Sequence, residues 1–274
     1  MSTASTPTSA PAFSIATWNV NSLRIRHERL LAWLDAHKPD VLCLQELKMQ
    51  EQDYPSLEFQ NVGYHSVVLG QKTYNGVAIL WRKEHGPAAA VQTGMSDGDP
   101  DNEARLIAAT LPGLGVRVMS VYVPNGQSID SDKYVYKLRF LERLHAYLSR
   151  SEKADAPLLI CGDYNIAPAD LDCYDPPGWV DTVICHVKVR EAWAKLLGYG
   201  LHDTLRLMQP DTKVYTYWDY RQLAFPKNQG LRIDHVLCTT PLKERCIEAV
   251  ADRNARKGEK PSDHVPLIVK FRAA

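Results

Sequence analysis

The stretch 157–165, PLLICGDYN, joins a short apolar run to a polar end, and this combination recurs along the chain. Pro157–Cys161 has the length and aliphatic content of a buried strand, and Gly162-Asp163-Tyr164-Asn165 follows it directly. Asp163 and Asn165 are two residues apart, so an extended backbone would point both side chains to the same side. The stretch predicts a buried strand that delivers polar groups to one rim of a sheet.

Seven further runs of strand length, rich in Val, Ile or aromatic residues, lie on both sides of it: Phe13–Trp18, Val41–Leu44, Gly76–Trp81, Leu106–Leu111, Val116–Val123, Ile233–Cys238 and Val265–Phe271. Helical spacing lies between some of them. One helix face is formed by Tyr134, Leu138, Leu141, Leu144 and Leu148, and shorter patterns occur at 30–34 and 189–197. The chain therefore predicts an α/β (α+β) fold, with two β-sheets packed face to face and helices outside.

The composition is that of an ordinary globular protein, with 274 residues of which 45% are hydrophobic. We expect a single domain over residues 13–272, because no repeat or low-complexity linker interrupts it. The Ser/Thr/Ala/Pro-rich segment 1–12 has no Lys, no Arg and no apolar core, which predicts a short disordered tail instead of a signal or transit peptide. No run approaches the roughly 20 apolar residues of a membrane span.

The charges balance, since 32 Lys and Arg face 32 Asp and Glu. This excludes a polybasic protein that holds nucleic acid by excess positive charge. It allows a nucleic-acid enzyme whose basic rim is offset by acids around a metal. The six cysteines include no C-x-x-C pair, and Cys43, Cys161 and Cys238 lie in apolar runs. We therefore expect buried free thiols and a reducing cytosol.

Acids, amides and a histidine stand where the apolar runs begin or end: Trp18-Asn19, Gln45-Glu46, Tyr122, Asp163-Tyr164-Asn165, Ile233-Asp234-His235 and Ser262-Asp263-His264. Carboxylate and amide oxygens suit a hard cation such as Mg²⁺, which helps to hydrolyse phosphodiesters. A His beside a carboxylate can donate to a phosphate oxygen. Each group alone has an ordinary explanation as a turn former, a helix cap or a strand aromatic. Their coincidence is what favours a catalytic site.

Taken in order, five motifs resemble those of the bacterial exonuclease III family of apurinic/apyrimidinic (AP) endonucleases, within the endonuclease/exonuclease/phosphatase superfamily. They are WNVNSLR (18–24), LQELK (44–48), GDYNIAP (162–168), GLRID (230–234) and KPSDH (260–264). The likeness runs from about Phe13 to Phe271, and it implies a four-layered α/β sandwich. A phosphatase of the superfamily that acts on an inositol phosphate or a lipid head group, and a non-catalytic regulator that binds RNA or protein, remain alternatives.

The resemblance also implies roles for single residues. Glu46 would be the principal metal ligand, with Asn19 and Asp263 helping to hold the ion or its waters, and Asp163, Asn165 and His264 close enough to share it. Asp163 would orient or deprotonate the nucleophile or protonate the leaving group. The scissile phosphate would be contacted by the remaining groups of the site, which are Asn165, Tyr122, Asn125 and His264, the last oriented by Asp234. His235 is interpreted as structural.

A further block, YTYWDYR (215–221) followed by GLR (230–232), resembles the part of the DNA-repair branch that walls a pocket for a base-less sugar. Without the family match, Tyr217 and Trp218 would pass as ordinary strand core. The resemblance thus predicts DNA contacts for the pocket wall and for nearby cations: Tyr217, Trp218, Leu231, Arg24, Lys48, Asn125, Arg221 and Lys227.

The resulting expectation is an enzyme that depends on Mg²⁺, with Mn²⁺ as a possible substitute. It would incise duplex DNA 5′ to abasic sites and would trim or unblock 3′ ends, as an exonuclease and a 3′-phosphatase. Its partner would be double-stranded DNA with abasic sites or blocked 3′ ends. We expect a monomer in the bacterial cytosol or nucleoid, with no membrane association.

Overall fold

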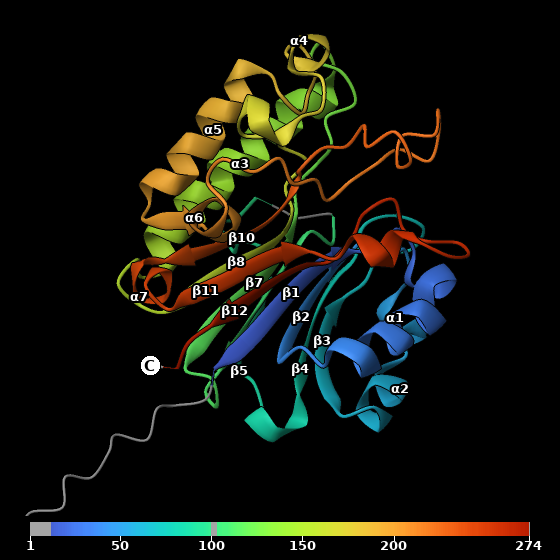
Figure 1. Ribbon diagram of the computed structural model, residues 1–274. Helices are drawn as coiled ribbons and strands as arrows, with labels where there is room; N and C mark the ends of the chain where they lie inside the picture. Colours follow the sequence, from blue (N-terminus) through green and yellow to red (C-terminus); the bar gives the residue numbers. More distant parts are fainter. Residues whose placement is uncertain (1–11, 100–102, 274) are drawn as a thin grey trace, which may run out of the picture.

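Two six-stranded β-sheets pack face to face in the computed structural model, which describes residues 12–99 and 103–273 (Figure 1). The tail predicted at 1–12 lies outside the described residues except for Ala12. The first sheet has the order β11 (Cys246–Ala251), β12 (Leu267–Phe271), β1 (Phe13–Asn19), β2 (Val41–Gln45), β4 (Val77–Arg82) and β3 (Tyr64–Leu69). The second has the order β5 (Ala89–Thr93), β6 (Leu106–Leu111), β7 (Val116–Tyr122), β8 (Leu158–Asp163), β10 (Asp234–Thr239) and β9 (Leu201–Asp203).

Helices cover the outer faces of both sheets (Figure 1). The first sheet is covered by α1 (Leu23–His37) and α2 (Ser56–Asn61), and the second by α3 (Asp132–Ser151) and α5 (Val187–Gly198). Shorter helices are α4 (Pro176–Trp179), α6 (Thr204–Met208) and α7 (Thr240–Lys243), and 3₁₀ turns lie at Glu51–Asp53, Lys83–His85, Asp170–Asp172 and Arg253–Arg256. The predicted α/β sandwich with four layers is confirmed.

Three apolar cores hold these layers together. The central core lies between the sheets, where Cys43 of β2 packs with side chains of β6, β7, β8 and β10. Leu42 and Leu44 of the same strand point the other way, into the core shared with α1. A strand that is buried on both faces has no polar alternation, because neither face meets water. This is why the central strands are continuous apolar runs in the sequence.

Each sheet contains one parallel pair of strands joined by a helix. β1 and β2 are parallel and connected by α1, and β7 and β8 are parallel and connected by α3. Local signals fix these helices: Ser131 accepts a hydrogen bond from the Tyr134 amide at the start of α3, and Lys38 adopts a left-handed conformation at the end of α1, before Pro39. Both parallel pairs therefore end at the same rim of the sandwich.

The chain contains no helix, among the residues whose placement is described, that is long and apolar enough to cross a membrane. All six cysteines are free thiols with buried side chains. For Cys43, Cys161 and Cys238 this is what their apolar runs predicted.

Candidate active site

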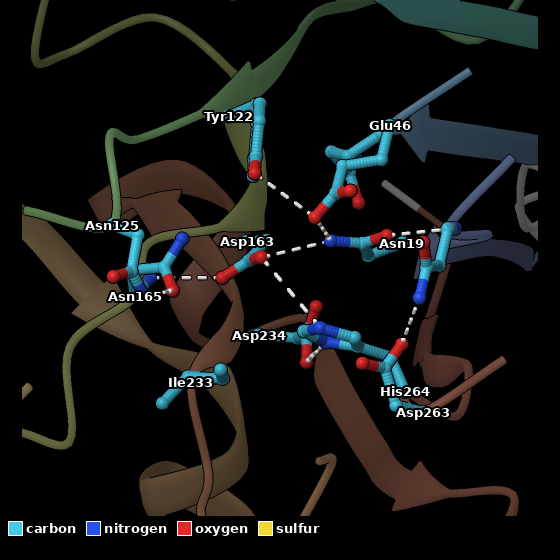
Figure 2. A network of polar contacts seen from close by, with 12 residues as sticks. Asn19, Glu46, Tyr122, Asn125, Asp163, Asn165, Ile233, Asp234, Asp263 and His264 are labelled. Carbon is cyan, nitrogen blue, oxygen red and sulfur yellow. Dashed lines mark hydrogen bonds and ion pairs between the residues drawn. The ribbon is translucent and has the colours of Figure 1, made fainter. Parts of the chain in front are cut away.

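The site forms where the parallel strand pairs end. Asn19 at the end of β1 is level with Gln45 at the end of β2, and Tyr122 at the end of β7 is level with Asp163 of β8. β10 starts at this rim, because Asp234 pairs with Asp163 in antiparallel register. Since the ends of neighbouring strands share an edge, side chains far apart in sequence meet here (Figure 2).

Backbone conformations at this rim are unusual. Glu46, Lys48 and Asn165 have φ angles of 54°, 54° and 51°, and Asn21 and Ser22 have φ angles of 43° and 87°. Residues that carry a side chain rarely occupy this left-handed region, and such residues concentrate at functional sites. They lie in the segments that directly follow β1, β2 and β8.

Asn19 connects the two halves of the sandwich. Its buried Nδ2 donates to Glu46 Oε1 at 2.8 Å and to Asp163 Oδ2 at 2.9 Å (Figure 2). Its Oδ1 accepts a hydrogen bond from the backbone amide of Asn21 at 2.9 Å. The amide thus fixes a carboxylate from each sheet relative to the other, and its oxygen is already engaged within the protein.

Glu46 has three polar neighbours. Besides Asn19, the Tyr122 hydroxyl donates to Oε1 at 2.9 Å and the Lys48 ammonium lies 2.9 Å from Oε2. Burial opposes ionisation of Glu46, but Lys48 and the hydrogen bond from Asn19 outweigh it and lower the pKa of the carboxyl. Glu46 is therefore an ionised carboxylate at neutral pH. Burial beside Glu46 and Asp163 raises the pKa of Tyr122, which remains a hydroxyl.

His264 lies between two carboxylates. Its Nδ1 is 2.8 Å from Asp234 Oδ2, and its Nε2 is 3.8 Å from Asp163 Oδ2. Burial alone would lower the pKa of His264, but Asp234 and Asp163 raise it above the ordinary value. Burial raises the pKa of Asp163, with Asp234 adding to the effect and His264 opposing it. The pair combines an imidazolium with a carboxyl group that holds a proton more readily than an exposed one.

Two amides form the opposite wall. Asn125 Nδ2 donates to Asn165 Oδ1 at 3.0 Å, and Asn165 Nδ2 donates to the carbonyl of Val123 at 3.0 Å. The backbone amide of Asn165 donates to Asp163 Oδ1 at 2.8 Å, so one residue links the acid and the amide pair. We refer to Asn125 and Asn165 as the amide pair.

Asp263 joins the site through Asn21. Asn21 Nδ2 donates to Asp263 Oδ1 at 2.9 Å, and Asn21 Oδ1 accepts from Lys48 Nζ at 2.5 Å. The series of contacts Asp263–Asn21–Lys48–Glu46 therefore links the segment before β12 to the segment after β2. The sequence identified Asp263 and Glu46, but it did not show that Asn21 and Lys48 connect them.

The donor set fits a hard divalent cation. Glu46, Asp163, Asp234 and Asp263 offer carboxylate oxygens, the ligands that Mg²⁺ prefers. Asp234 Oδ1 is buried and has no hydrogen-bond partner among the described residues, so the cluster has spare acceptor capacity. Asp163, Asp234 and His264 can each place one ligand atom within 4.8 Å of the others. His264 Nδ1 is engaged by Asp234, which raises the pKa of the imidazole and favours its protonated form.

A cavity of about 270 Å³ lies beside this network. Its wall includes Tyr217 and Leu231, which the resemblance assigned to a pocket wall, together with Tyr174 and with Trp179, the last residue of α4. The Tyr217 ring lies 5.0 Å from the His264 ring, so the cavity adjoins the polar network. The prediction for Trp218 needs a correction: this side chain is 0% exposed and packs in the core behind the wall, because Tyr217 and Trp218 point to opposite sides of an extended segment.

The side chains predicted to contact DNA as cations differ in exposure and in whether they already pair with an acid. Arg24 is exposed and lines, with Lys48, a second cavity of about 540 Å³. Arg221 is exposed next to the first cavity, and its guanidinium pairs with Asp219 at 2.8 Å. Lys227 is exposed. Lys48 contributes less free charge than its sequence position indicated, because it is already bound to Glu46.

His235 belongs to a buried structural network, in agreement with the sequence interpretation. Its Nδ1 lies 3.0 Å from the Arg232 guanidinium and its Nε2 lies 2.9 Å from the carbonyl of Ile166. Arg232 in turn binds Asp172 and Asp203, at 2.6 and 2.7 Å. Burial lowers the pKa of His235 to about 4, and Arg232 adds to this, so the ring is neutral at pH 7.

Lys137 is a residue that the sequence reasoning missed. It lies on the inward face of α3, and its Nζ donates to backbone carbonyls next to the site. Burial lowers its pKa to about 7, which Asp163 opposes. A signal was present, since Lys137 is three residues after Tyr134 and four before Leu141, on the apolar stripe of the helix. A lysine on such a stripe needs an internal partner.

The chain matches the model of the Endonuclease/Exonuclease/phosphatase family over residues 16–264. It is 36% identical over 267 residues to Exodeoxyribonuclease III of Haemophilus influenzae, which covers 93% of this chain and 98% of that protein. An AP endonuclease from Archaeoglobus fulgidus has the same fold, with a TM-score of 0.90, 42% identity and coverage of 94% and 99%. The 3′ phosphatase NExo from Neisseria, solved with a product DNA hairpin, has a TM-score of 0.90, 40% identity and the same coverage.

The chain therefore belongs to the Endonuclease/Exonuclease/phosphatase family. Its relatives are exodeoxyribonucleases and AP endonucleases that match nearly their whole length, so it is a nuclease of this group. This confirms the family that the five sequence motifs indicated.

Proposed function

We propose that the protein is a Mg²⁺-dependent phosphodiesterase of DNA repair. It incises duplex DNA 5′ to an abasic site to leave a 3′-hydroxyl, and it removes blocking groups or nucleotides from 3′ ends. The observation that carries the proposal is the contact between the acid, amide and histidine network and the cavity walled by Tyr217 and Leu231. Relatives named as an exodeoxyribonuclease, an AP endonuclease and a 3′ phosphatase support the same chemistry.

Glu46 is the principal ligand of the Mg²⁺ in this proposal, because its pKa is lowered and its carboxylate faces the space shared with Asp163. Asp263 contributes a further oxygen. The ion, which Mn²⁺ can replace, neutralises phosphate charge when it is bound. Asn19 aligns the carboxylates of Glu46 and Asp163 through its Nδ2. His264, although predicted near the metal, is assigned to the phosphate, since an imidazolium repels a cation.

Asp163 orients the attacking water and takes its proton. Its raised pKa makes it a stronger base than an exposed aspartate, while Asn19 and the Asn165 amide hold its two oxygens in place. His264, held cationic by Asp234, donates to a phosphate oxygen. The amide pair binds the remaining phosphate oxygens, where negative charge increases in the transition state, and Tyr122, whose hydroxyl donates to Glu46, lies close to the phosphate.

The cavity beside His264 selects the substrate. Tyr217 and Leu231 form apolar walls for a sugar that has lost its base, and a missing base makes it cheaper to turn the nucleotide out of the helix. Trp218 supports these walls from behind. Four cations contact the DNA backbone and position the duplex without reading its sequence. They are Arg24, Arg221, Lys227 and Lys48, the last with less free charge because it pairs with Glu46.

We further propose that the chain acts as a monomer built from one domain, residues 13–272, in the bacterial cytosol or nucleoid. The partner is double-stranded DNA that carries abasic sites or blocked 3′ ends. The buried free cysteines agree with a reducing compartment.

Product analysis on three matched duplexes tests the proposal. The duplexes differ only in carrying an abasic site, a 3′-phosphate or a plain recessed 3′ end, and each is incubated with Mg²⁺ or with EDTA. We expect incision 5′ to the abasic site with a 3′-hydroxyl product, release of phosphate from the blocked end, and neither reaction in EDTA. The Asp163→Asn variant should lose both reactions by several orders of magnitude and still bind the duplex.

Two results would contradict the proposal. Undiminished cleavage in EDTA would exclude the metal, and near-normal turnover by Asp163→Asn would exclude the role of this acid. Lys153→Ala serves as the control, because Lys153 lies in the loop before β8 at the opposite end of that strand from Asp163. Its turnover should equal that of the wild type.

A further inference from the structure

Lys137 is the one lysine that is fully buried among residues 12–99 and 103–273. It is 0% exposed, on the face of α3 that packs against the second sheet. Burying an ammonium costs several kcal/mol unless hydrogen bonds compensate for the lost water. A lysine is retained at such a position when its three N–H groups have specific acceptors.

Those acceptors are three backbone carbonyls from three different segments. Lys137 Nζ donates to the carbonyls of Asn125 at 3.1 Å, Asn165 at 2.6 Å and Val183 at 2.7 Å. Three acceptors require three N–H donors, so only the ammonium form can make all three bonds, since a neutral amine has two. One side chain thereby joins the turn after β7, the loop after β8 and the segment before α5.

Two of these carbonyls belong to the amide pair. Asn165 stands at φ 51°, a conformation that the backbone does not favour, and its carbonyl receives the shortest of the three bonds. Gly126, next to Asn125, has φ 101°, and a Cβ there would lie 3.2 Å from Lys137 Cδ. The turn therefore fits closely around the lysine stem, and the lysine sets the distance between the two loops.

We propose that Lys137 is a positioning residue for the reaction: from beneath the site it holds the backbones of Asn125 and Asn165, so that their side chains meet the scissile phosphate in one fixed arrangement. This inference rests on the proposed function. Lys137 itself is covered by the loops it binds and does not touch the substrate. We expect the loss of Lys137 to lower kcat more than it weakens duplex binding. Binding is spread over many backbone contacts, whereas the amide pair acts at the reacting phosphate in the transition state.

Lys137→Met tests the inference, because methionine fills similar space without a charge or donors. We expect kcat to fall by about 10- to 100-fold, the usual cost of displacing a reacting group by about 1 Å, while KM changes less than about threefold. Leu144→Ala is the matched control on the same face of α3, where Leu144 is 0% exposed and lies in the apolar core. It should lower the midpoint of thermal unfolding and leave kcat within about twofold.

A double-mutant cycle with Asn125→Ala separates positioning from general destabilisation. If Lys137 acts through the amide pair, its removal matters less once Asn125 is already truncated. For single losses of about 10-fold and 50-fold, independent roles would multiply to about 500-fold, whereas we expect a combined loss below about 100-fold. A multiplicative result, or a kcat of Lys137→Met that stays within about twofold of the wild type as in Leu144→Ala, would overturn the inference.

The cycle is run on whichever of the three duplexes the wild type cleaves fastest, well below the unfolding midpoints. A wild type that cleaves none of them contradicts the proposed function, whereas multiplicative losses on a good substrate contradict the inference about Lys137 alone. If Lys137→Met does not fold, Lys137→Gln replaces it, because the amide keeps two donors. The same cycle and the same outcomes then apply.

Discussion

Asp234→Asn removes the charge that keeps His264 cationic and preserves an acceptor for the hydrogen bond from its ring. Asp234 Oδ2 lies 2.8 Å from His264 Nδ1, and an asparagine oxygen can still accept the hydrogen bond from the ring. The variant therefore separates the electrostatic role of Asp234 from its role in orienting the imidazole. The exposed fraction of His264 is 4%, so solvent screens this interaction little.

The expected effect on the pKa follows from Coulomb's law. Two unit charges about 4 Å apart interact by about 4 kcal/mol at an effective dielectric constant near 20, which corresponds to about 3 pKa units. The retained hydrogen bond and the remaining charge of Asp163 reduce the change, so we expect the pKa of His264 to fall by about 2 units. A raised pKa means that the cation is present at neutral pH and is lost as pH rises. In Asp234→Asn that loss moves to lower pH.

The assay is the pH dependence of kcat/KM for phosphate release from a 3′-phosphorylated duplex at fixed Mg²⁺. The alkaline limb of the wild-type profile should move toward neutral pH by about 2 units in the variant. Asn125→Ala serves as the control, since it removes a phosphate contact without changing a charge and should lower the whole profile by one factor. The same uniform loss in Asp234→Asn, with an unmoved alkaline limb, would refute the cationic role of His264.

Three further variants test the buried surroundings of the site. His235→Gln removes a ring whose pKa burial lowers to about 4, so protonation of His235 favours the unfolded chain. In urea unfolding, the free energy of unfolding of the wild type should fall by about 2 kcal/mol relative to the variant between pH 6.5 and 5, and a constant difference would contradict this. Trp218→Ala should lower the free energy of unfolding by about 3–5 kcal/mol. If the variant instead is as stable as the wild type and loses only abasic incision, Trp218 faces the cavity. Asp172→Asn leaves the buried Arg232 without its closest carboxylate, so the free energy of unfolding should fall by about 3–5 kcal/mol at pH 7 in the same assay. An unchanged unfolding midpoint would contradict this.

The strands that the sequence predicted are the central ones. Eight apolar runs correspond to β1, β2, β4, β6, β7, β8, β10 and β12, and the four strands it missed, β3, β5, β9 and β11, are the four sheet edges. A central strand is buried on both faces, which leaves a continuous apolar run. An edge strand is partly exposed, as in β5, where four of five residues are exposed, and its sequence resembles a loop.

The membership of the polar network was largely predictable, because its residues follow or begin buried strands. Its internal pairing was not. The spacing in sequence does not show that Lys48 binds Glu46, because this contact depends on the left-handed turn after β2. It does not show either that Asn19 links Glu46 to Asp163, since the contact with Asp163 depends on how the two sheets pack. The orientation of adjacent aromatic residues was equally open: Tyr217 and Trp218 must point to opposite sides, and only the packing decides which one faces the cavity.

The position of a bound metal tests the central claim most directly. Crystals grown with Mn²⁺ and measured at its absorption edge would locate the ion by anomalous scattering, in the wild type and in Glu46→Gln. The account predicts a peak in contact with the Glu46 carboxylate, in the space it shares with Asp163, and loss of this peak in the variant. A peak found instead at the remote group of Asp40, Glu84 and His85, or one that persists unchanged in Glu46→Gln, would contradict it.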